Sequence, residues 1–100
     1  MKVVITEPAR FRLKHIYQYY NTAASISVAN KIRLAVIDKI YSLKKFPLKG
    51  QVEENLKDLH QDHRYLVTGH IKIIYRIYKD IVYITDIFDT RQDPGKMGKL

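Results

Sequence analysis

The sequence predicts an α+β fold in which a helix hairpin packs on one face of a small, mainly antiparallel sheet, in the order β-α-α-β-β-β. Three observations lead to this prediction. Apolar residues recur twice at helical spacing in the first half of the chain, three apolar runs rich in β-branched and aromatic residues follow in the second half, and only short breaks separate these runs. A chain of 100 residues is expected to form one domain, residues 1–100.

The first strand and the first helix are predicted from the N-terminal residues. Residues 2–6, KVVIT, are mostly β-branched and predict a short strand. Thr6 is a candidate helix cap, and Pro8 suits a first helical turn because its missing N–H would have no partner there. A helix is expected over about 8–22, with an apolar face formed by Ala9, Leu13, Ile16, Tyr17, Tyr20 and Ala24.

A second helix is expected to follow after a short link, with Ser25 or Ser27 as its cap. Its apolar face is predicted to run through Val28, Ile32, Val36, Ile40 and Leu43, with the helix continuing to Lys45. Pro47 and Gly50 stop it. Two amphipathic helices joined by so short a link are expected to pack as an antiparallel hairpin.

The second half of the chain is predicted to begin with a loop over 46–62, containing at most one helical turn. Strands are then expected over 63–67, 70–79 and 81–88, and the short breaks between them predict antiparallel pairing.

Alternation along the middle strand predicts which side chains face the helices. Ile71, Ile73, Tyr75 and Ile77 share one face, and we expect Ile73, Tyr75 and Ile84 to be core residues. The opposite face is expected to be a mixed cationic and aromatic surface formed by His70, Lys72, Ile74, Arg76 and Tyr78.

Composition limits the classes of function. The net charge of +8 favours an anionic partner, such as nucleic acid, the ribosome or an acidic protein. The chain has no cysteine, which excludes disulfides, thiolate catalysis and cysteine metal sites. It also has no signal-like apolar segment and no run near the ~20 apolar residues of a membrane span. We therefore expect a cytoplasmic protein that does not enter the membrane.

Four cations are candidates for binding an anionic target: Arg64, Lys72, Arg76 and Arg91. Arg64, Lys72 and Arg91 come from three separate apolar runs, and antiparallel pairing is expected to bring Arg91 near Lys72. The alternative is structural: strand cations often only blunt sheet edges, and an aspartate near Arg91, either Asp89 or Asp93, is a candidate salt-bridge partner.

The same cations are weak candidates for catalysis. A metal-free ribonuclease needs a base, an acid and cations on the reacting phosphate. Arg64, Lys72 and Arg91 are candidate cations, the base candidates are Glu53, Glu54 and His63, and no convincing acid is present. His60 and His63, with Asp58 and Asp62 nearby, form only a weak metal pattern, and we expect neither metal nor cofactor.

The segment RYLVTGHIKIIYRI…VYITDIFDTRQDP, residues 64–94, resembles the RelE/ParE superfamily of toxins from type II toxin–antitoxin (plasmid stabilisation) modules. The order of elements is similar over nearly the whole chain. The resemblance implies a small basic protein that inhibits growth and is neutralised by a cognate acidic antitoxin. By position, Lys72 matches the strand cation and Arg91 the C-terminal arginine of the RelE-like nucleases.

The superfamily divides by target. RelE-like members cut mRNA on the ribosome, whereas ParE-like members inhibit DNA gyrase. The nucleases carry a tyrosine, or a histidine and tyrosine, near the C-terminus, and residues 84–100 of this chain hold neither. The resemblance therefore slightly favours ParE-like action on gyrase and replication. A ribosome-dependent mRNA endonuclease is the alternative, and a non-toxic basic nucleic-acid-binding module is a second alternative.

Overall fold

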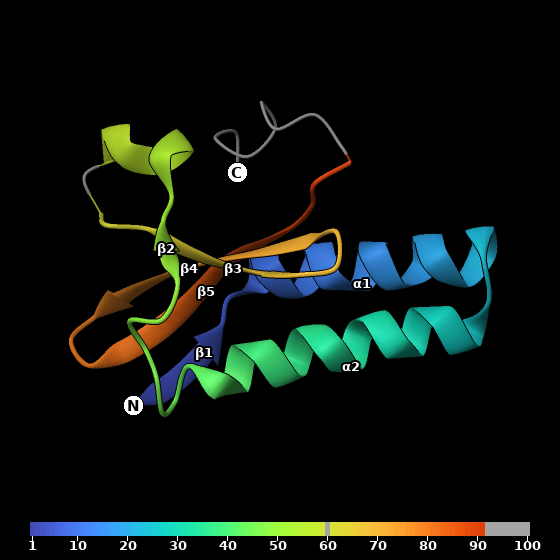
Figure 1. The fold of residues 1–100 in the computed structure, drawn as a ribbon, viewed down its shortest axis with the longest axis horizontal. Coiled ribbons are helices and arrows are strands. Elements are labelled where there is room, and N and C mark those ends of the chain that lie inside the picture. The colour runs from blue at the N-terminus through green and yellow to red at the C-terminus, as the bar shows by residue number, and fades with distance from the viewer. Residues whose placement is uncertain (60, 92–100) are drawn as a thin grey trace.

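The computed structural model describes residues 1–59 and 61–91, and it has two helices on one face of a five-stranded sheet (Figure 1). The strand order is β1-β5-β4-β3-β2; β1 pairs in parallel with β5 and every other pair is antiparallel. This arrangement confirms the predicted fold class. The elements in chain order are β1 (Lys2–Ile5), α1 (Glu7–Ala23), α2 (Ile26–Ser42), β2 (Gln51–Val52), the 3₁₀ helix η1 (Glu54–Leu59), β3 (Arg64–Thr68), β4 (Ile71–Tyr78) and β5 (Ile81–Asp89).

Side-chain caps fix where the two helices begin. The Thr6 hydroxyl accepts the Ala9 N–H at 3.4 Å and also donates to the Ile84 carbonyl at 2.6 Å, so one residue caps α1 and attaches it to the sheet. The Ser25 hydroxyl accepts the Val28 N–H at 3.1 Å and caps α2, which decides between the two predicted serines. The second helix ends at Ser42, three residues earlier than predicted.

The main core lies between the helices and the sheet. Ile73, Tyr75 and Ile84 have no exposed surface, as predicted. They pack with residues of both helices: Ala9, Leu13, Ile16, Val36, Ile40 and Leu43. The prediction for Val28 is wrong, because 39% of it is exposed while Ala29 takes the inward position. No helix in the described part of the chain is long and apolar enough to span a membrane.

A β-bulge interrupts the pairing of β4 with β5. Tyr75 pairs with Ile84 and Ile74 with Asp86, so Thr85 is the extra residue of β5. Because of this insertion, Ile84 and Ile87 both face the helices although they are three residues apart.

The far face of the sheet was predicted to be a mixed cationic and aromatic surface, and this is wrong for the part around Ile74, which is buried. The η1 segment lies on that side of the sheet, opposite the helices (Figure 1). There Leu56 packs on Ile74 and Phe88, and Tyr65 packs against this second small core. The predicted loop over 46–62 thus contains the short strand β2 and η1.

Candidate functional site

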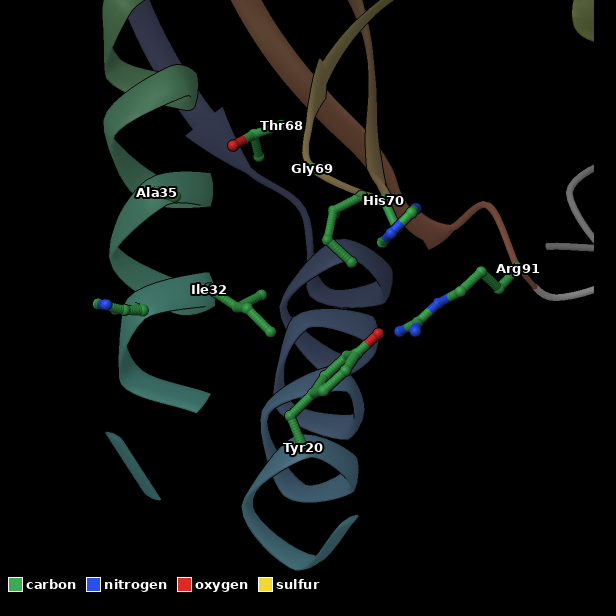
Figure 2. Close-up of a pocket in the computed structure, with 9 residues that line it drawn as sticks. Tyr20, Ile32, Ala35, Thr68, Gly69, His70 and Arg91 are labelled. Carbon is green, nitrogen blue, oxygen red and sulfur yellow. The ribbon is translucent and has the colours of Figure 1, made fainter. Parts of the chain in front are cut away.

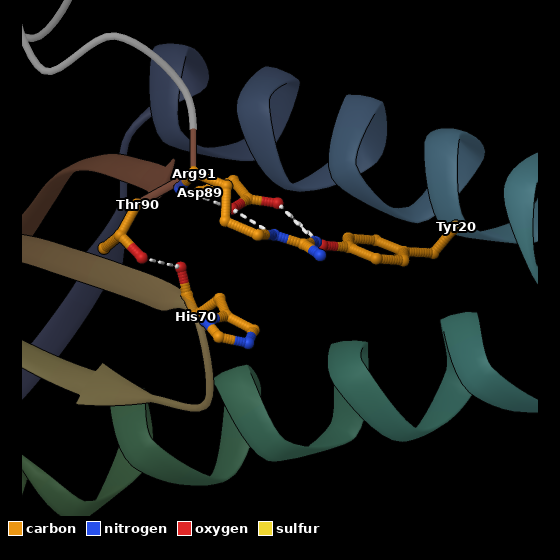
Figure 3. A network of polar contacts seen from close by, with 5 residues as sticks. All are labelled: Tyr20, His70, Asp89, Thr90 and Arg91. Atoms are coloured by element: carbon orange, nitrogen blue, oxygen red, sulfur yellow. Dashed lines mark hydrogen bonds and ion pairs between the residues drawn. The ribbon is translucent and has the colours of Figure 1, made fainter.

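Arg91 is held at the end of β5 by a network of polar contacts (Figure 3). Its Nε and Nη2 donate to Asp89 Oδ1 and Oδ2 at 3.2 and 3.1 Å, and its backbone N–H donates to Oδ1 at 3.0 Å. The Tyr20 hydroxyl of α1 donates to Asp89 Oδ2 at 2.7 Å. Asp89 is therefore the salt-bridge partner of Arg91, while Asp93, the other candidate, lies outside the described residues.

The network presents Arg91 outward while it buries Asp89. Asp89 is 6% exposed, whereas the Arg91 side chain is 51% exposed. The guanidinium carbon lies 5.1 Å from the centre of the Tyr20 ring. A two-point ion pair and an aromatic face restrict the long arginine side chain, so its free N–H groups are pre-oriented for a planar anion.

A cavity of about 280 Å³ adjoins this arginine (Figure 2). It lies between α2 and the turn that joins β3 to β4, and its apolar walls include Ile32, Ala35 and Ile71. Tyr20 and Arg91 form its other side. The cavity and the exposed guanidinium together make this end of the sheet the strongest candidate binding site.

Lys72 lies on the opposite face of the sheet. Its ammonium group forms an ion pair with Glu53, which is only 2% exposed, and lies 4.2 Å from the centre of the Tyr65 ring. Lys72 thereby compensates the buried charge of Glu53, because a carboxylate out of water is costly without a cation.

His63 and Arg76 extend this far-face cluster. His63 is 5% exposed, and burial lowers its pKa below the ordinary 6.5; nearby Arg76 lowers the pKa further, and Glu53 opposes both effects. Arg76 lies over the Tyr78 ring, with its guanidinium carbon 5.3 Å from the ring centre. Of the three base candidates, Glu53 and His63 are thus packed into the domain, whereas Glu54 is exposed at the start of η1.

Arg64 takes a third position, at the start of β3. Its Nη1 donates to the carbonyl oxygen of Gly50 at 2.9 Å, which fastens the chain before β2 to the sheet. Arg64 pairs across the strands with Tyr75, whereas Thr68 at the other end of β3 pairs with Ile71 near Arg91.

The expected convergence of Arg64, Lys72 and Arg91 is therefore wrong. Ile71 pairs with Asp89 on the face toward the helices, and Lys72, the next residue along β4, points to the other face. Antiparallel register does bring their backbones together, but alternation separates the side chains.

The weak metal pattern around His63 is not assembled in the part of the chain described. Residues 1–59 and 61–91 contain no group of three potential ligand side chains placed to hold a metal ion. His60, one of the two histidines of that pattern, lies outside the described residues.

Comparison with known proteins identifies the family. The family model described as the ParE toxin of type II toxin–antitoxin systems, parDE, matches residues 3–94. The chain belongs to the ParE toxin family. This ParE family member is similar in structure to a solved chain of the chromosomal ParDE toxin–antitoxin system from P. aeruginosa, with a TM-score of 0.74 and 18% identity. The similarity covers 89% of this chain and 95% of that one. Curated protein sequences gave no match.

The partners of Arg91 in this ParE family member were only partly visible in the sequence. Tyr20 was predicted as a residue of the apolar helix face, and its ring does pack on the core. Its hydroxyl reaches an aspartate 69 residues away, a contact that no local pattern shows. In the sequence, this contact is signalled only by a tyrosine near the end of a helix and an acid at the end of a strand.

Asp86 is a third buried acid, after Glu53 and Asp89, and no sequence pattern indicated it. Because β1 pairs only with residues 81–84 of β5, the rest of β5 is an edge, and there Arg12 Nε approaches Asp86 Oδ1 at 3.7 Å. Asp86 Oδ1 also accepts the Ile87 N–H at 2.8 Å. Burial nevertheless raises the pKa of Asp86 above its ordinary 3.8, and these two contacts only partly offset that effect.

This raised pKa predicts a pH dependence of stability. A carboxyl group whose pKa is higher in the folded state lowers the free energy of unfolding as it ionises. Above its ordinary pKa of 3.8, the parent protein should lose stability relative to Asp86→Asn as the pH rises through the raised pKa. Urea unfolding of both proteins over a pH series measures the difference. Parallel stability curves would contradict the prediction.

Proposed function

We propose that this ParE family member is a growth-inhibiting toxin that acts as a single domain in the cytoplasm. A cognate antitoxin neutralises it, and its target is DNA gyrase, which it inhibits by binding. The observation that carries this proposal is the separation of Lys72 and Arg91 on opposite faces of the sheet.

Metal-free RNA cleavage requires cations that meet on one phosphate, beside an accessible base and acid. Here Lys72 compensates a buried carboxylate, and Arg91 lies beside the helices. Two of the three candidate bases, Glu53 and His63, are nearly fully buried. The third, Glu54, is exposed, but it begins η1 on the face of the sheet opposite the helices and Arg91 (Figure 1). This arrangement supports inhibition by binding over a ribosome-dependent mRNA endonuclease.

The proposal is tested by inducing the toxin in cells and following three signals in parallel: a DNA-damage reporter, the rate of protein synthesis and cleavage of mRNA on ribosomes. Gyrase inhibition should activate the reporter before protein synthesis falls. Early ribosomal mRNA cleavage would instead support the endonuclease, and growth without inhibition would support the non-toxic nucleic-acid-binding module.

The antitoxin is proposed to bind as an acidic segment, helical or extended, across the helix hairpin. Residues 7–45, which include both helices, hold eight Lys and Arg against two Asp and Glu, whereas residues 46–91 hold seven of each. A groove of about 480 Å³ runs between α1 and α2, with Leu13 and Ile37 among its apolar walls and Arg10, Lys14 and Arg33 beside them. An amphipathic acidic segment suits both features.

Charge on the hairpin predicts salt-dependent association with the antitoxin. Complementary charge accelerates encounter, and salt screens it. The association rate with the antitoxin encoded beside the toxin gene should fall about tenfold or more between low and high salt. Stopped-flow mixing measures this rate. Arg33→Gln should slow association more than Lys39→Gln, which removes an exposed charge from the same helix outside the groove. Equal rates at all salt concentrations would refute the electrostatic account.

A further inference from the structure

We propose that the cavity beside Arg91 is a docking site for the toxin's target protein. It takes an apolar side chain, and Arg91 binds a carboxylate next to that side chain. The identity of the occupant rests on the proposed function, in which the toxin inhibits a target protein by binding it. The cavity is assigned to that target and not to the antitoxin.

The cavity is suited to one apolar side chain. Ile32, Ala35 and Ile71 line it, and the Tyr20 ring forms a further wall (Figure 2). Its volume of about 280 Å³ is at the lower end of ligand pockets, which is enough for one aromatic or branched aliphatic group. Burying such a group there would remove apolar surface from water on both partners.

The free edge of Arg91 supplies the anion contact. A guanidinium has five N–H donors, and Asp89 accepts one from Nε and one from Nη2. The remaining three, two on Nη1 and one on Nη2, have no hydrogen-bond partner among the described residues. Nη1 and Nη2 together form a second fork that fits a carboxylate with two parallel hydrogen bonds.

Two contacts hold this fork in place relative to the cavity. Tyr20, which fixes Asp89, also walls the cavity. Thr90, the residue before Arg91, donates from its N–H and its hydroxyl to the His70 carbonyl at 2.7 and 3.0 Å (Figure 3). The β3–β4 turn and the arginine therefore form one unit, which lowers the entropy lost on binding.

The position of the cavity favours the target over the antitoxin. Along α2, Lys31, Ile32 and Ala35 line this cavity, whereas Asn30, Arg33, Ile37 and Tyr41 line the groove between the helices. At 3.6 residues per turn, these two sets lie on different sides of the helix. An antitoxin in the groove would leave the cavity to another protein. A nucleic acid fits less well, because its phosphates are flanked by polar sugars rather than apolar groups.

The chemistry of the site is tested with two small probes, 4-phenylbutanoate and its uncharged amide, 4-phenylbutanamide. In an NMR titration of the ¹⁵N-labelled protein, the carboxylate should shift the amide signals of Gly69, His70 and Ile71 and the Nε–H signal of Arg91. We expect it to bind about three- to fivefold more tightly than the amide, as for an exposed ion pair. Equal binding of both probes, or no shift at these signals, would overturn the proposal.

The assignment to the target is tested in cells with Ala35→Phe, which places a ring in the cavity mouth from an exposed position of α2. The matched control is Ala23→Phe, at an exposed alanine of α1 outside the cavity. The two variants are compared at equal soluble levels and unchanged melting temperature. Cells that express Ala35→Phe should plate at least about tenfold more efficiently than cells that express the parent, because blocking the cavity removes one cluster of contacts with the target. Ala35→Phe should still be captured by the antitoxin.

The outcomes separate this inference from the proposed function. Full toxicity of Ala35→Phe would overturn the assignment of the cavity to the target. Lost antitoxin capture with retained toxicity would assign the cavity to the antitoxin instead, which also overturns it. A parent protein that does not inhibit growth refutes the proposed function, and the probe titration then still decides whether the cavity binds apolar carboxylates.

Discussion

Arg91→Ala should abolish most of the toxicity of this protein while it leaves the fold and antitoxin binding intact. The side chain is half exposed, and removing it leaves Asp89 still bonded by the Tyr20 hydroxyl and by the backbone N–H of residue 91. Asp89 is only 6% exposed and would lose its cation, so the loss of stability should be about 1–3 kcal/mol, limited by the two hydrogen bonds that remain. We expect toxicity to fall because alanine supplies no donor in place of the free fork of the guanidinium, which is proposed to bind the target.

The measurement is growth of cells that express the parent, Arg91→Ala or Arg91→Lys at matched soluble levels. Lysine keeps the charge but lacks the planar fork, so it should retain only part of the toxicity. Capture by the antitoxin should be equal for all three proteins. Full killing by Arg91→Ala would show that the salt bridge to Asp89 is the whole role of this arginine.

Tyr75→Ala should have the largest effect on stability. Tyr75 has no exposed surface and lies in the main core between the helices and the sheet. Truncating a buried aromatic side chain to alanine costs about 3–5 kcal/mol, because it removes apolar contacts and leaves a cavity. Urea unfolding measures the loss. A variant as stable as the parent would mean that the two faces of β4 are assigned the wrong way round.

Tyr75→Phe separates the hydroxyl from the ring. The hydroxyl accepts the Gly50 N–H at 2.9 Å and donates to the Pro47 carbonyl at 2.8 Å, and burial raises its pKa above the ordinary 10.0, so it stays protonated. Phenylalanine leaves both backbone groups without this partner, which should cost about 1–3 kcal/mol. Tyr78→Phe is the matched control: Tyr78 is 49% exposed, and its loss of a hydroxyl should change stability by at most about 0.5 kcal/mol.

The same hydroxyl explains why position 50 is glycine. A Cβ there would lie 2.5 Å from the Tyr75 oxygen and 2.7 Å from the Tyr65 carbonyl oxygen. From the sequence, Gly50 is expected only to stop the second helix. Its closer reason is this contact between the segment after α2 and the centre of the sheet, across 25 residues of chain.

Only the tertiary structure revealed the contacts that decide the site. The contacts of Arg91 with Tyr20, of Lys72 with Glu53 and of Arg12 with Asp86 join residues 19 to 74 positions apart. The packing of η1 on Ile74 could not be predicted from the sequence either, because residues 54–59 are mainly polar and a single leucine, Leu56, makes the contact. The pairing register brings the backbones of Arg91 and Lys72 close together, but their side chains lie on opposite faces of the sheet.

The sequence by itself determined the two helices, the four longer strands, their order and most of the core of the helix-facing side of this protein. Local signals sufficed for these: Thr6 and a serine at position 25 or 27 are candidate caps, apolar spacing selects the buried faces, and short breaks force antiparallel pairing. Tertiary structure alone decided which cations compensate buried acids and which one keeps free donors. The physical reason is that the cost of burying a charge is met by whichever partner the fold brings near, and sequence distance does not restrict that choice.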